Sequence, residues 1–403
     1  MNIATNSQVK RLFPNIESGS NGSSCFYCQE YGSLTDRYKE WDQFLPKDHP
    51  LQSSHLLFLE KSVPRDLEFR YAFIYENISG GDVPLIAVFY LQIVHFNSKH
   101  YLSPFSNQPI LHQLEKVIIG RERIILTLGN LFRVDFPGAY WNPSVSTKEI
   151  AMICNKYLKS FKPKAHIILI KDTVGELGNE LYKYGFQHWN NDLTMKMDIN
   201  LHWKSFEDYI SSLRHKYAQR ARRSRAKLRD VKRTELSLDE IIHYSARIEK
   251  LYLQVVQKQP IRMVIASKNY FIEMKLAYQN QFKVFGYFKE DALIAFSSNI
   301  LYESSWELHY IGFDYGQNAE HWLYFNIMFD AIADAISEGK KELELGRTAR
   351  EAKAIIGGRP IYFESYYKIR TRFTKYLVRI LTDFFNKNTG KDWEKHHPFK
   401  PIA

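Results

Sequence analysis

The sequence predicts an α/β protein made of two tandem domains, each built on a mixed β-sheet. Strand-like and helix-like hydrophobic patterns succeed one another along the chain, and they do so in the same order twice. The length of 403 residues, with 45% apolar and 25% charged residues, is that of a globular chain of two or three domains. The chain has 19 glycines and 14 prolines, which excludes collagen-like and low-complexity proteins.

The first copy of this order lies in the first half of the chain. Ser146 and Glu149 form a capping-box pattern, and apolar residues then recur every three or four positions up to Phe161, which predicts a helix. The elements expected around this helix are strands at 68–76, 83–94 and 123–128 before it, and a strand at 166–170, a short helix ending near Gly185 and a strand at 193–199 after it.

The second half repeats the order. Phe325, Met328 and Ile332 share one helical face, and Gly339 follows as the expected C-terminal cap. The elements expected around this helix are strands at 282–288, 292–301, 306–313 and 342–345, a turn with a short helix at 346–358, and a strand at 361–369. Antiparallel strands followed by a helix crossover to a parallel strand form a mixed sheet.

These patterns set the domain boundaries that we expect. The first domain spans residues 50–200, and the second spans residues 201–385. Residues 1–49 are expected to be a tail and lead-in, and residues 386–403 a C-terminal tail.

Several classes of protein are excluded by what the sequence lacks. The longest apolar run, 83–96, is too short to span a bilayer, and the N-terminus has no apolar core of signal-peptide length. Three cysteines exclude a disulfide framework, and the pair Cys25 and Cys28 has no further ligands for zinc. We therefore expect a cytoplasmic protein with no transmembrane segment and no metal.

Positive charge is concentrated in one segment. The formal net charge is +11, and residues 214–233 hold ten Lys or Arg against one acid, Asp230. Ser205 and Asp208 predict a helix start before this segment, and the apolar stripe of the helix fades where the charges begin. A polyphosphate-bearing donor, an RNA or an anionic membrane surface would each relieve the repulsion, and a solvated face without a ligand is equally consistent.

Two stretches of the sequence carry a family resemblance. The run LELGRTAREAKAIIGGRP (343–360) is similar to the L-G-R-T-x-x-x-K-x-x-x-G run of Fem-like acyltransferases, through Gly346, Arg347, Thr348, Lys353 and Gly357. The run WKSFEDYISSLRHKYAQRARRSRAK (203–227) resembles the W-x-S-x-x-x-Y motif and Arg-rich helix of the same family. The chain thus resembles Fem-like acyltransferases of the GNAT superfamily, with two tandem GNAT-like domains.

The resemblance implies an N-acyltransferase that moves an acyl or aminoacyl group onto an amine. Such enzymes use direct attack of a neutral amine, which needs a base, a donor for the oxyanion and an anchor for the phosphates of the acyl donor. The pyrophosphate loop of coenzyme A-dependent members, Gln/Arg-x-x-Gly-x-Gly/Ala, is not matched at 136–149 or at 313–325. Acyl-coenzyme A is therefore one candidate donor, and the donor stays open.

Glu307 and His309 are the catalytic candidates. The strand 306–313 places them on one face at positions i and i+2, in an otherwise aromatic strand where ionisable groups are unusual. One of them can act as a general base, directly or through water. The alternatives are that the two side chains only pair with each other, or that their face is exposed to solvent.

Two groups of cations are the donor- and anion-binding candidates. Arg347 and Lys353 follow a buried strand at the start of a helix, where backbone donors and a guanidinium suit an anion. The alternative is that Arg347 caps or bridges the edge of the sheet. Arg220, Arg223 and Lys227 form one stripe of the basic helix. The matching turn of the first half, 171–178, is net negative, so we expect the second copy to be the active one.

The leading hypothesis is an N-acyltransferase that takes a small-molecule acyl donor and an amine acceptor. The alternative is a non-catalytic protein that binds RNA or transfer RNA through the basic helix. A peripheral membrane protein is a third hypothesis, which depends on the same charges and has no amphipathic anchor.

Overall fold

The computed structural model describes residues 8–11, 16–17, 23–62, 66–77, 83–97, 100, 122–173, 175–190, 192–259, 261–370 and 391–401. The chain divides into two compact units. Unit 1 comprises Met1–Asp192, Ile261–Val264 and Phe363–Phe384, and unit 2 comprises Leu193–Pro260, Ile265–Tyr362 and Phe385–Ala403. Within the described part of the chain, no helix is long and apolar enough to cross a membrane.

Unit 1 is built on a ten-stranded mixed sheet with the main order β1-β3-β4-β5-β6-β8-β17-β9. Its strands are β1 (Gln8–Arg11), β2 (Ile16–Glu17), β3 (Ser23–Tyr31), β4 (Leu67–Asn77), β5 (Leu85–Phe96), β6 (Arg123–Leu128), β7 (Ala139–Trp141), β8 (Ile167–Ile170), β9 (Gln187–His188) and β17 (Tyr366–Ile369). Its helices are α1 (Tyr38–Phe44), α2 (Leu57–Ser62), α4 (Thr147–Ser160) and α5 (Leu177–Tyr182), with a 3-10 turn at Ser53–His55.

Helix α4 begins as its sequence requires. The Ser146 hydroxyl accepts from the Glu149 backbone N–H, and the Glu149 carboxylate accepts from the Ser146 N–H in return. The apolar face of α4, from Ile150 to Leu158, packs on the strands of the sheet around Leu126 and Ile168. The predicted helix and its capping box are therefore confirmed.

Unit 2 is built on a seven-stranded mixed sheet with the order β11-β12-β13-β14-β15-β10-β16. Its strands are β10 (Leu193–Asp198), β11 (Val231–Glu235), β12 (Phe282–Lys289), β13 (Ala292–Leu301), β14 (Ser305–Phe313), β15 (Glu342–Glu344) and β16 (Arg359–Tyr362). Its helices are α6 (Phe206–Ser212), α7 (His215–Ala226), α8 (Leu238–His243), α9 (Ser245–Val256), α10 (Lys268–Tyr278), α11 (Tyr315–His321), α12 (Leu323–Ser337) and α13 (Arg350–Ile355), with 3-10 turns at Gln279–Gln281 and Asp392–Lys395.

In both units, antiparallel strands lead into a helix that crosses over to a parallel strand. In unit 1 this crossover is α4, between the parallel strands β6 and β8. In unit 2 it is α12, between the parallel strands β14 and β15, and Gly339 follows α12 with a positive φ of 63°. The predicted fold class, two mixed α/β sheets in tandem, is confirmed.

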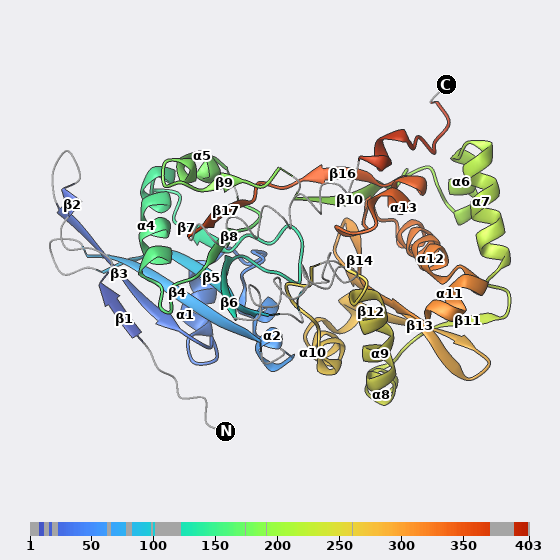
Figure 1. Cartoon of the computed structure of the whole chain (residues 1–403), viewed down its shortest axis with the longest axis horizontal. Coiled ribbons are helices and arrows are strands. Elements are labelled where there is room, and N and C mark those ends of the chain that lie inside the picture. The colour runs from blue at the N-terminus through green and yellow to red at the C-terminus, as the bar shows by residue number, and fades with distance from the viewer. Residues whose placement is uncertain are drawn as a thin grey trace, which may run out of the picture. The chain divides into compact units, whose positions relative to one another are not determined.

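Each half of the chain contributes one strand to the sheet that is built mainly from the other half. Strand β17, from the second half of the sequence, lies between β8 and β9 of unit 1, and β10, from the first half, lies between β15 and β16 of unit 2. Figure 1 shows this directly, because the red β17 runs among strands of unit 1 and the green β10 runs beside the orange β16. Each sheet is therefore complete only when both halves of the chain are present.

The segment that leads into β17 is fixed by hydrogen bonds. Phe363 N–H donates to the Asp192 carbonyl at 2.9 Å, and Thr173 N–H donates to the Glu364 carbonyl at 2.8 Å. The fully buried Ser365 hydroxyl donates to the Asp192 carboxylate and accepts from the Asp172 N–H. Within unit 1, these contacts hold a late segment of the chain against Asp192 and against the residues that follow β8.

Because of this exchange, the structure differs from the sequence prediction at two strands. The strand at 193–199 was expected in the first domain, but it is β10 of the second sheet. The strand expected at 361–369 is two strands, β16 and β17, which belong to different sheets. Hydrophobic alternation shows that a segment is a strand, but it does not show which sheet the strand joins.

Both ends of the described chain also differ from the expected tails. Strand β3 lies in the first sheet although it precedes residue 50, where the first domain was expected to begin. At the C-terminal end, Trp393 is buried in the core of unit 2, and Phe399 packs on Trp203 and Tyr209. In the sequence these aromatic residues stand among polar and charged ones, so no apolar pattern predicts that they are packed.

Candidate functional site

Strand β14 carries a β-bulge at the position of His309. Asn299 of β13 pairs with Leu308, and the next residue, Ser298, pairs with Tyr310, so His309 is the additional residue. A bulge redirects the side chains around it and is common beside functional sites. The parallel register between β14 and β15 extends only from Ser305 to Glu307. The bulge therefore lies where the two strands stop pairing.

The bulge also reverses which face the following residues occupy. Trp306 and Leu308 belong to the apolar cluster formed with α12, whereas Tyr310 contacts Tyr252 of α9. Gly312 allows this face of β14 to approach α9 closely, because a Cβ there would lie 2.5 Å from the Tyr252 backbone nitrogen. Glu307 lies on the α9 and α10 side of the sheet, opposite α12.

A hydrogen-bonded line of three side chains crosses this face. Glu307 Oε1 lies 2.8 Å from His309 Nδ1, and the Tyr270 hydroxyl lies 2.7 Å from His309 Nε2. The Tyr302 hydroxyl donates to Glu307 Oε2 at 3.0 Å. The carboxylate fixes the imidazole proton on Nδ1, so that Nε2 accepts from Tyr270. The sequence-predicted pair Glu307 and His309 is thus brought together and buried, with Tyr270 at its end.

Glu344 is a second buried carboxyl next to this line. It is the register partner of Glu307 in the parallel pair of β14 and β15. Its Oε1 accepts from the Thr194 hydroxyl and, at 2.7 Å, from the Gly346 N–H. Burial, together with the charge of Glu307, raises the pKa of Glu344 to about 7.

Lys353 and Arg347 follow β15, but only one of them is near the surface. Lys353 is buried, and its ammonium donates to the Gly346 carbonyl at 3.1 Å. Burial lowers the pKa of Lys353 to about 7, against the opposing effect of Glu344. Arg347 is half-buried in the turn before α13. Of the two predicted anion-binding residues here, Arg347 is the better placed for a phosphate.

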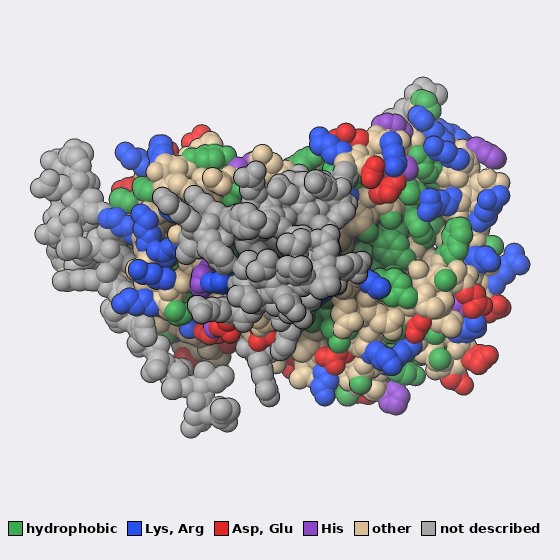
Figure 2. Space-filling view, in the orientation of Figure 1, with side chains coloured by type: hydrophobic (Ala, Val, Ile, Leu, Met, Phe, Trp, Pro, Cys, Tyr) green, Lys and Arg blue, Asp and Glu red, His purple; other side chains and the backbone are tan. Residues whose placement is uncertain are grey.

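Arg220 and Arg223 are exposed on α7, and Lys227 is exposed at the C-terminal cap of this helix. The Arg220 guanidinium lies 4.5 Å from the centre of the Phe325 ring, in the first turn of α12. The Lys227 carbonyl lies 3.0 Å from His321 Nδ1, just before α12 begins. In Figure 2, Lys and Arg side chains gather over the region where Figure 1 shows α7. The predicted stripe is therefore exposed beside the N-terminal end of the crossover helix.

Other cations of the basic segment are used inside unit 2. Arg225 pairs with Asp330 of α12 at 2.7 Å, and Arg233 of β11 pairs with Asp334. The Tyr287 hydroxyl donates to Asp330 at 2.9 Å. These arginines hold α7 and β11 to α12, so the ten cations of this segment divide into structural and exposed groups.

A groove of about 410 Å³ lies between α6 and α7. It is lined by Phe206, Glu207, Ile210, Arg222, Arg225, Ala226 and Arg229. Arg222 pairs with Glu207 across it, and Arg225 is paired with Asp330. Its positive charge is therefore largely neutralised by unit 2 itself.

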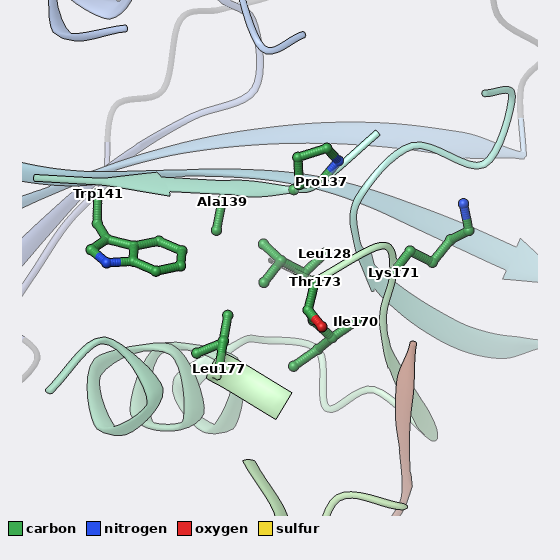
Figure 3. Close-up of a pocket in the computed structure, with 9 residues that line it drawn as sticks. Leu128, Pro137, Ala139, Trp141, Ile170, Lys171, Thr173 and Leu177 are labelled. Atoms are coloured by element: carbon green, nitrogen blue, oxygen red, sulfur yellow. The ribbon is translucent and has the colours of Figure 1, made fainter. Parts of the chain in front are cut away.

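In unit 1, different residues lie at the corresponding end of the parallel pair, β6 and β8. The Lys171 ammonium is buried and donates to the Asn130 carbonyl at 2.8 Å, with the Asp172 carboxylate at 3.3 Å. Figure 3 shows Lys171 pointing away from a small space that Ala139, Trp141 and Leu177 face. That space measures about 10 Å³, room for one water molecule. Unit 1 thus closes this end with its own loop.

Sequence reasoning missed Tyr270, Tyr302 and Glu344. The two tyrosines carry no signal, because they are two of 26 in the chain. Glu344 does carry one, since the run ELEL at 342–345 places a carboxyl in the middle of a strand expected to be buried. Among the described residues, no three His, Cys, Asp or Glu side chains are grouped to hold a metal ion.

The sequence matches no family model. A curated relative, the exocyst complex component SEC15A of Arabidopsis thaliana, is 33% identical over 89 residues. The match covers 22% of this chain and 11% of that protein. The chain therefore matches about a tenth of that relative's length.

Several solved structures resemble this chain over most of its length. FemX is 12% identical with a TM-score of 0.45, over 85% of this chain and 98% of that one. A tandem GNAT protein from the clavulanic acid biosynthesis pathway is 9% identical with a TM-score of 0.47, over 83% and 95%. L-PGS from Bacillus licheniformis is 11% identical with a TM-score of 0.42, over 84% and 98%. At these values, reaction and substrates must be argued from the residues of this chain.

Proposed function

We propose that this protein is an N-acyltransferase whose reacting groups lie in unit 2. The observation that carries the proposal is the buried line Glu307–His309–Tyr270, placed at the bulge where β14 and β15 stop pairing. A carboxylate that orients an imidazole, with a hydroxyl beyond it, is an arrangement that can accept a proton and pass it inward. The reaction class and the second-copy location both follow the sequence prediction.

In this reaction a neutral amine attacks the carbonyl carbon of an activated acyl group. A C–N bond forms, and the bond from the carbonyl carbon to the sulfur or oxygen of the donor breaks. The first proton of the ammonium passes to Tyr270, which gives its own proton to His309 Nε2, and Glu307 stabilises the resulting imidazolium. The second N–H proton leaves with the departing thiol or hydroxyl. No covalent enzyme intermediate is needed.

The donor's phosphates are assigned to exposed cations of unit 2. Of Arg220, Arg223 and Lys227, the Arg220 guanidinium lies over Phe325 in the first turn of α12, where the helix dipole also favours an anion. Arg347 supplies a guanidinium at the end of β15. Acyl-coenzyme A and an aminoacyl ester of RNA both present phosphates to such a surface, and both are donors to be tested.

We also propose that the protein acts in the cytoplasm, as the sequence predicts. The buried thiol of Cys154 is free, which suits a reducing compartment.

The test is acyl transfer by the full-length protein with a panel of acyl-coenzyme A donors and aliphatic amines. On a substrate pair that reacts, Glu307→Gln should lower kcat about a hundredfold, because it removes the charge that supports the imidazolium. Glu303→Gln is the matched control, since Glu303 is exposed in the turn before the same strand. Equal rates for E307Q and E303Q would show that the proton path is elsewhere.

A further inference from the structure

Glu344 is a buried carboxyl that the proton path above does not use. Only 5% of its surface is exposed. Its Oε1 holds two hydrogen bonds, from Thr194 and from Gly346, which fix the orientation of the carboxyl group. Its Oε2 is buried and has no hydrogen-bond partner among the described residues. A buried carboxylate oxygen without a donor is costly to maintain, so its presence needs an explanation.

The charged side chains around Glu344 are engaged elsewhere. Lys196, its register partner on β10, donates to Glu342 at 2.8 Å. Lys353 donates to the Gly346 carbonyl, and Glu307 accepts from Tyr302 and lies against His309. The carboxyl groups of Glu307 and Glu344 are register partners, and burial, together with the charge of Glu307, raises the pKa of Glu344 against the opposing effect of Lys196. A positively charged donor would satisfy Oε2 and relieve this repulsion.

We propose that Glu344 Oε2 binds the ammonium group of the acceptor, so that the acceptor is an aliphatic amine that is protonated at neutral pH. The role of this amine as the acceptor rests on the proposed function, whereas the ammonium site itself does not.

Other ligands suit the site less well. A divalent cation takes six or more oxygen ligands, and no group of three His, Cys, Asp or Glu is formed in the described part of the chain. A guanidinium prefers both oxygens of one carboxylate, and Oε1 is already occupied by Thr194 and Gly346. A neutral alcohol donates one hydrogen bond but brings no charge. An ammonium supplies both a donor and the missing charge.

The test is equilibrium binding of n-butylammonium to the full-length protein, measured by ligand-observed NMR. 1-Butanol, which lacks the charge, and tetramethylammonium, which lacks N–H donors, are the ligand controls. Glu344→Gln should weaken n-butylammonium binding about tenfold or more, since it removes one charge-assisted hydrogen bond. Glu342→Gln, two residues earlier on β15, is the matched control and should bind as the wild type does.

The outcomes separate this inference from the proposed function. Binding that is equal in E344Q and E342Q, or equal for all three ligands, overturns the ammonium site. Selective binding without acyl transfer from any donor supports the site and removes the proposed reaction. Should E344Q fail to fold, E344D keeps the charge but withdraws it by one methylene, and it must bind n-butylammonium more weakly than E342D. Equal binding in those two variants overturns the proposal as well.

Discussion

The two units differ most where their parallel strands meet. On the face opposite the crossover helix, unit 2 pairs Glu307 with Glu344, whereas unit 1 pairs Thr127 with Leu169. In unit 2, β14 continues along β13 to Phe313. In unit 1, β6 ends at Leu128 and β7 takes over the pairing with β5 after a packed loop. One arrangement of strands thus carries a buried pair of carboxyls in one unit and a packed loop in the other.

The polar groups of the two units have correspondingly different tasks. In unit 1, Lys171 and Asp172 bond to the backbone of the loop, so their charges stabilise the fold. In unit 2, the residues after β15 are Leu345 and Gly346, and Glu344 keeps one oxygen unused. Unit 1 also holds buried atoms without a partner among the described residues, Thr127 Oγ1 and Asn130 Nδ2, but these belong to neutral groups, whereas the unpartnered oxygen of Glu344 belongs to an ionisable carboxyl.

A proline in β17, the strand that the second half of the chain contributes to unit 1, should give the largest loss of stability. Tyr367 is in the middle of β17 and pairs with Leu169 on one side and Gln187 on the other, so Tyr367→Pro breaks both ladders. We expect unit 1 to lose hydrogen-exchange protection in β6 and β8, while β12 and β13 of unit 2 keep theirs. Tyr362→Pro, on the edge strand β16 that already contains Pro360, is the control. Uniform loss in both units would show that they do not unfold separately.

Removing the buried ammonium of unit 1 should be nearly as damaging. Lys171→Met leaves the Asp172 carboxylate buried without its cation, which destabilises a protein by about 3–5 kcal/mol. The measurement is the free energy of unfolding in urea, with exposed Lys164→Met as the control. A loss below about 1 kcal/mol would mean that the cluster is not a stabilising one.

Acid should weaken unit 1 through His55. Burial and the charge of Arg133 lower its pKa to about 4, from an ordinary value of 6.5. The folded state then binds fewer protons than the unfolded state between pH 6.5 and 4, so stability is full above pH 6.5 and falls by up to about 3 kcal/mol as pH drops to 4. His55→Gln should flatten this slope, and exposed His202→Gln should not. Parallel slopes for both variants would contradict the assignment.

The exposed stripe of α7, present only in unit 2, should give the smallest effect. Replacing Arg220, Arg223 and Lys227 with Gln should weaken donor binding about tenfold, with a modest salt dependence, because a small donor engages few phosphates. Arg222→Gln is the control, since Arg222 pairs with Glu207. If bulk RNA binds instead, and its affinity falls about a thousandfold between 50 and 200 mM salt, the RNA-binding alternative is favoured.

The sequence predicts local structure well where a pattern and a cap coincide. The Ser146 and Ser205 capping boxes and the C-terminal Gly339 begin or end helices as expected. The helix that Ser205 begins was expected to continue into the basic run, but it ends at Ser212, and a separate helix, α7, carries the basic residues up to Ala226. Strand β11 was missed, because its residues 231–235 continue the basic run and alternate weakly. Partner choice was also missed, since Leu193–Asp198 reads as a strand equally well in either sheet.

The candidate site was predicted in part for the same reason. Glu307 and His309 lie on one strand, so their spacing was enough to bring them together. Tyr270 reaches His309 from α10, 39 residues earlier, and Thr194 reaches Glu344 from 150 residues earlier. Contacts between distant segments depend on the tertiary fold, and no local pattern encodes them.

The exchanged strand has a consequence for how the protein is made. When β8 and β9 leave the ribosome, the strand that fills the place between them has not yet been synthesised. The chain must grow by about 180 residues before β17 follows, which takes about 10–35 s at ordinary rates of translation. During that interval the unpaired edges of β8 and β9 are open to other strands. Chaperone binding during synthesis should therefore be concentrated on the first half of the chain, although β17, the strand that completes the sheet of this half, is encoded in the second half.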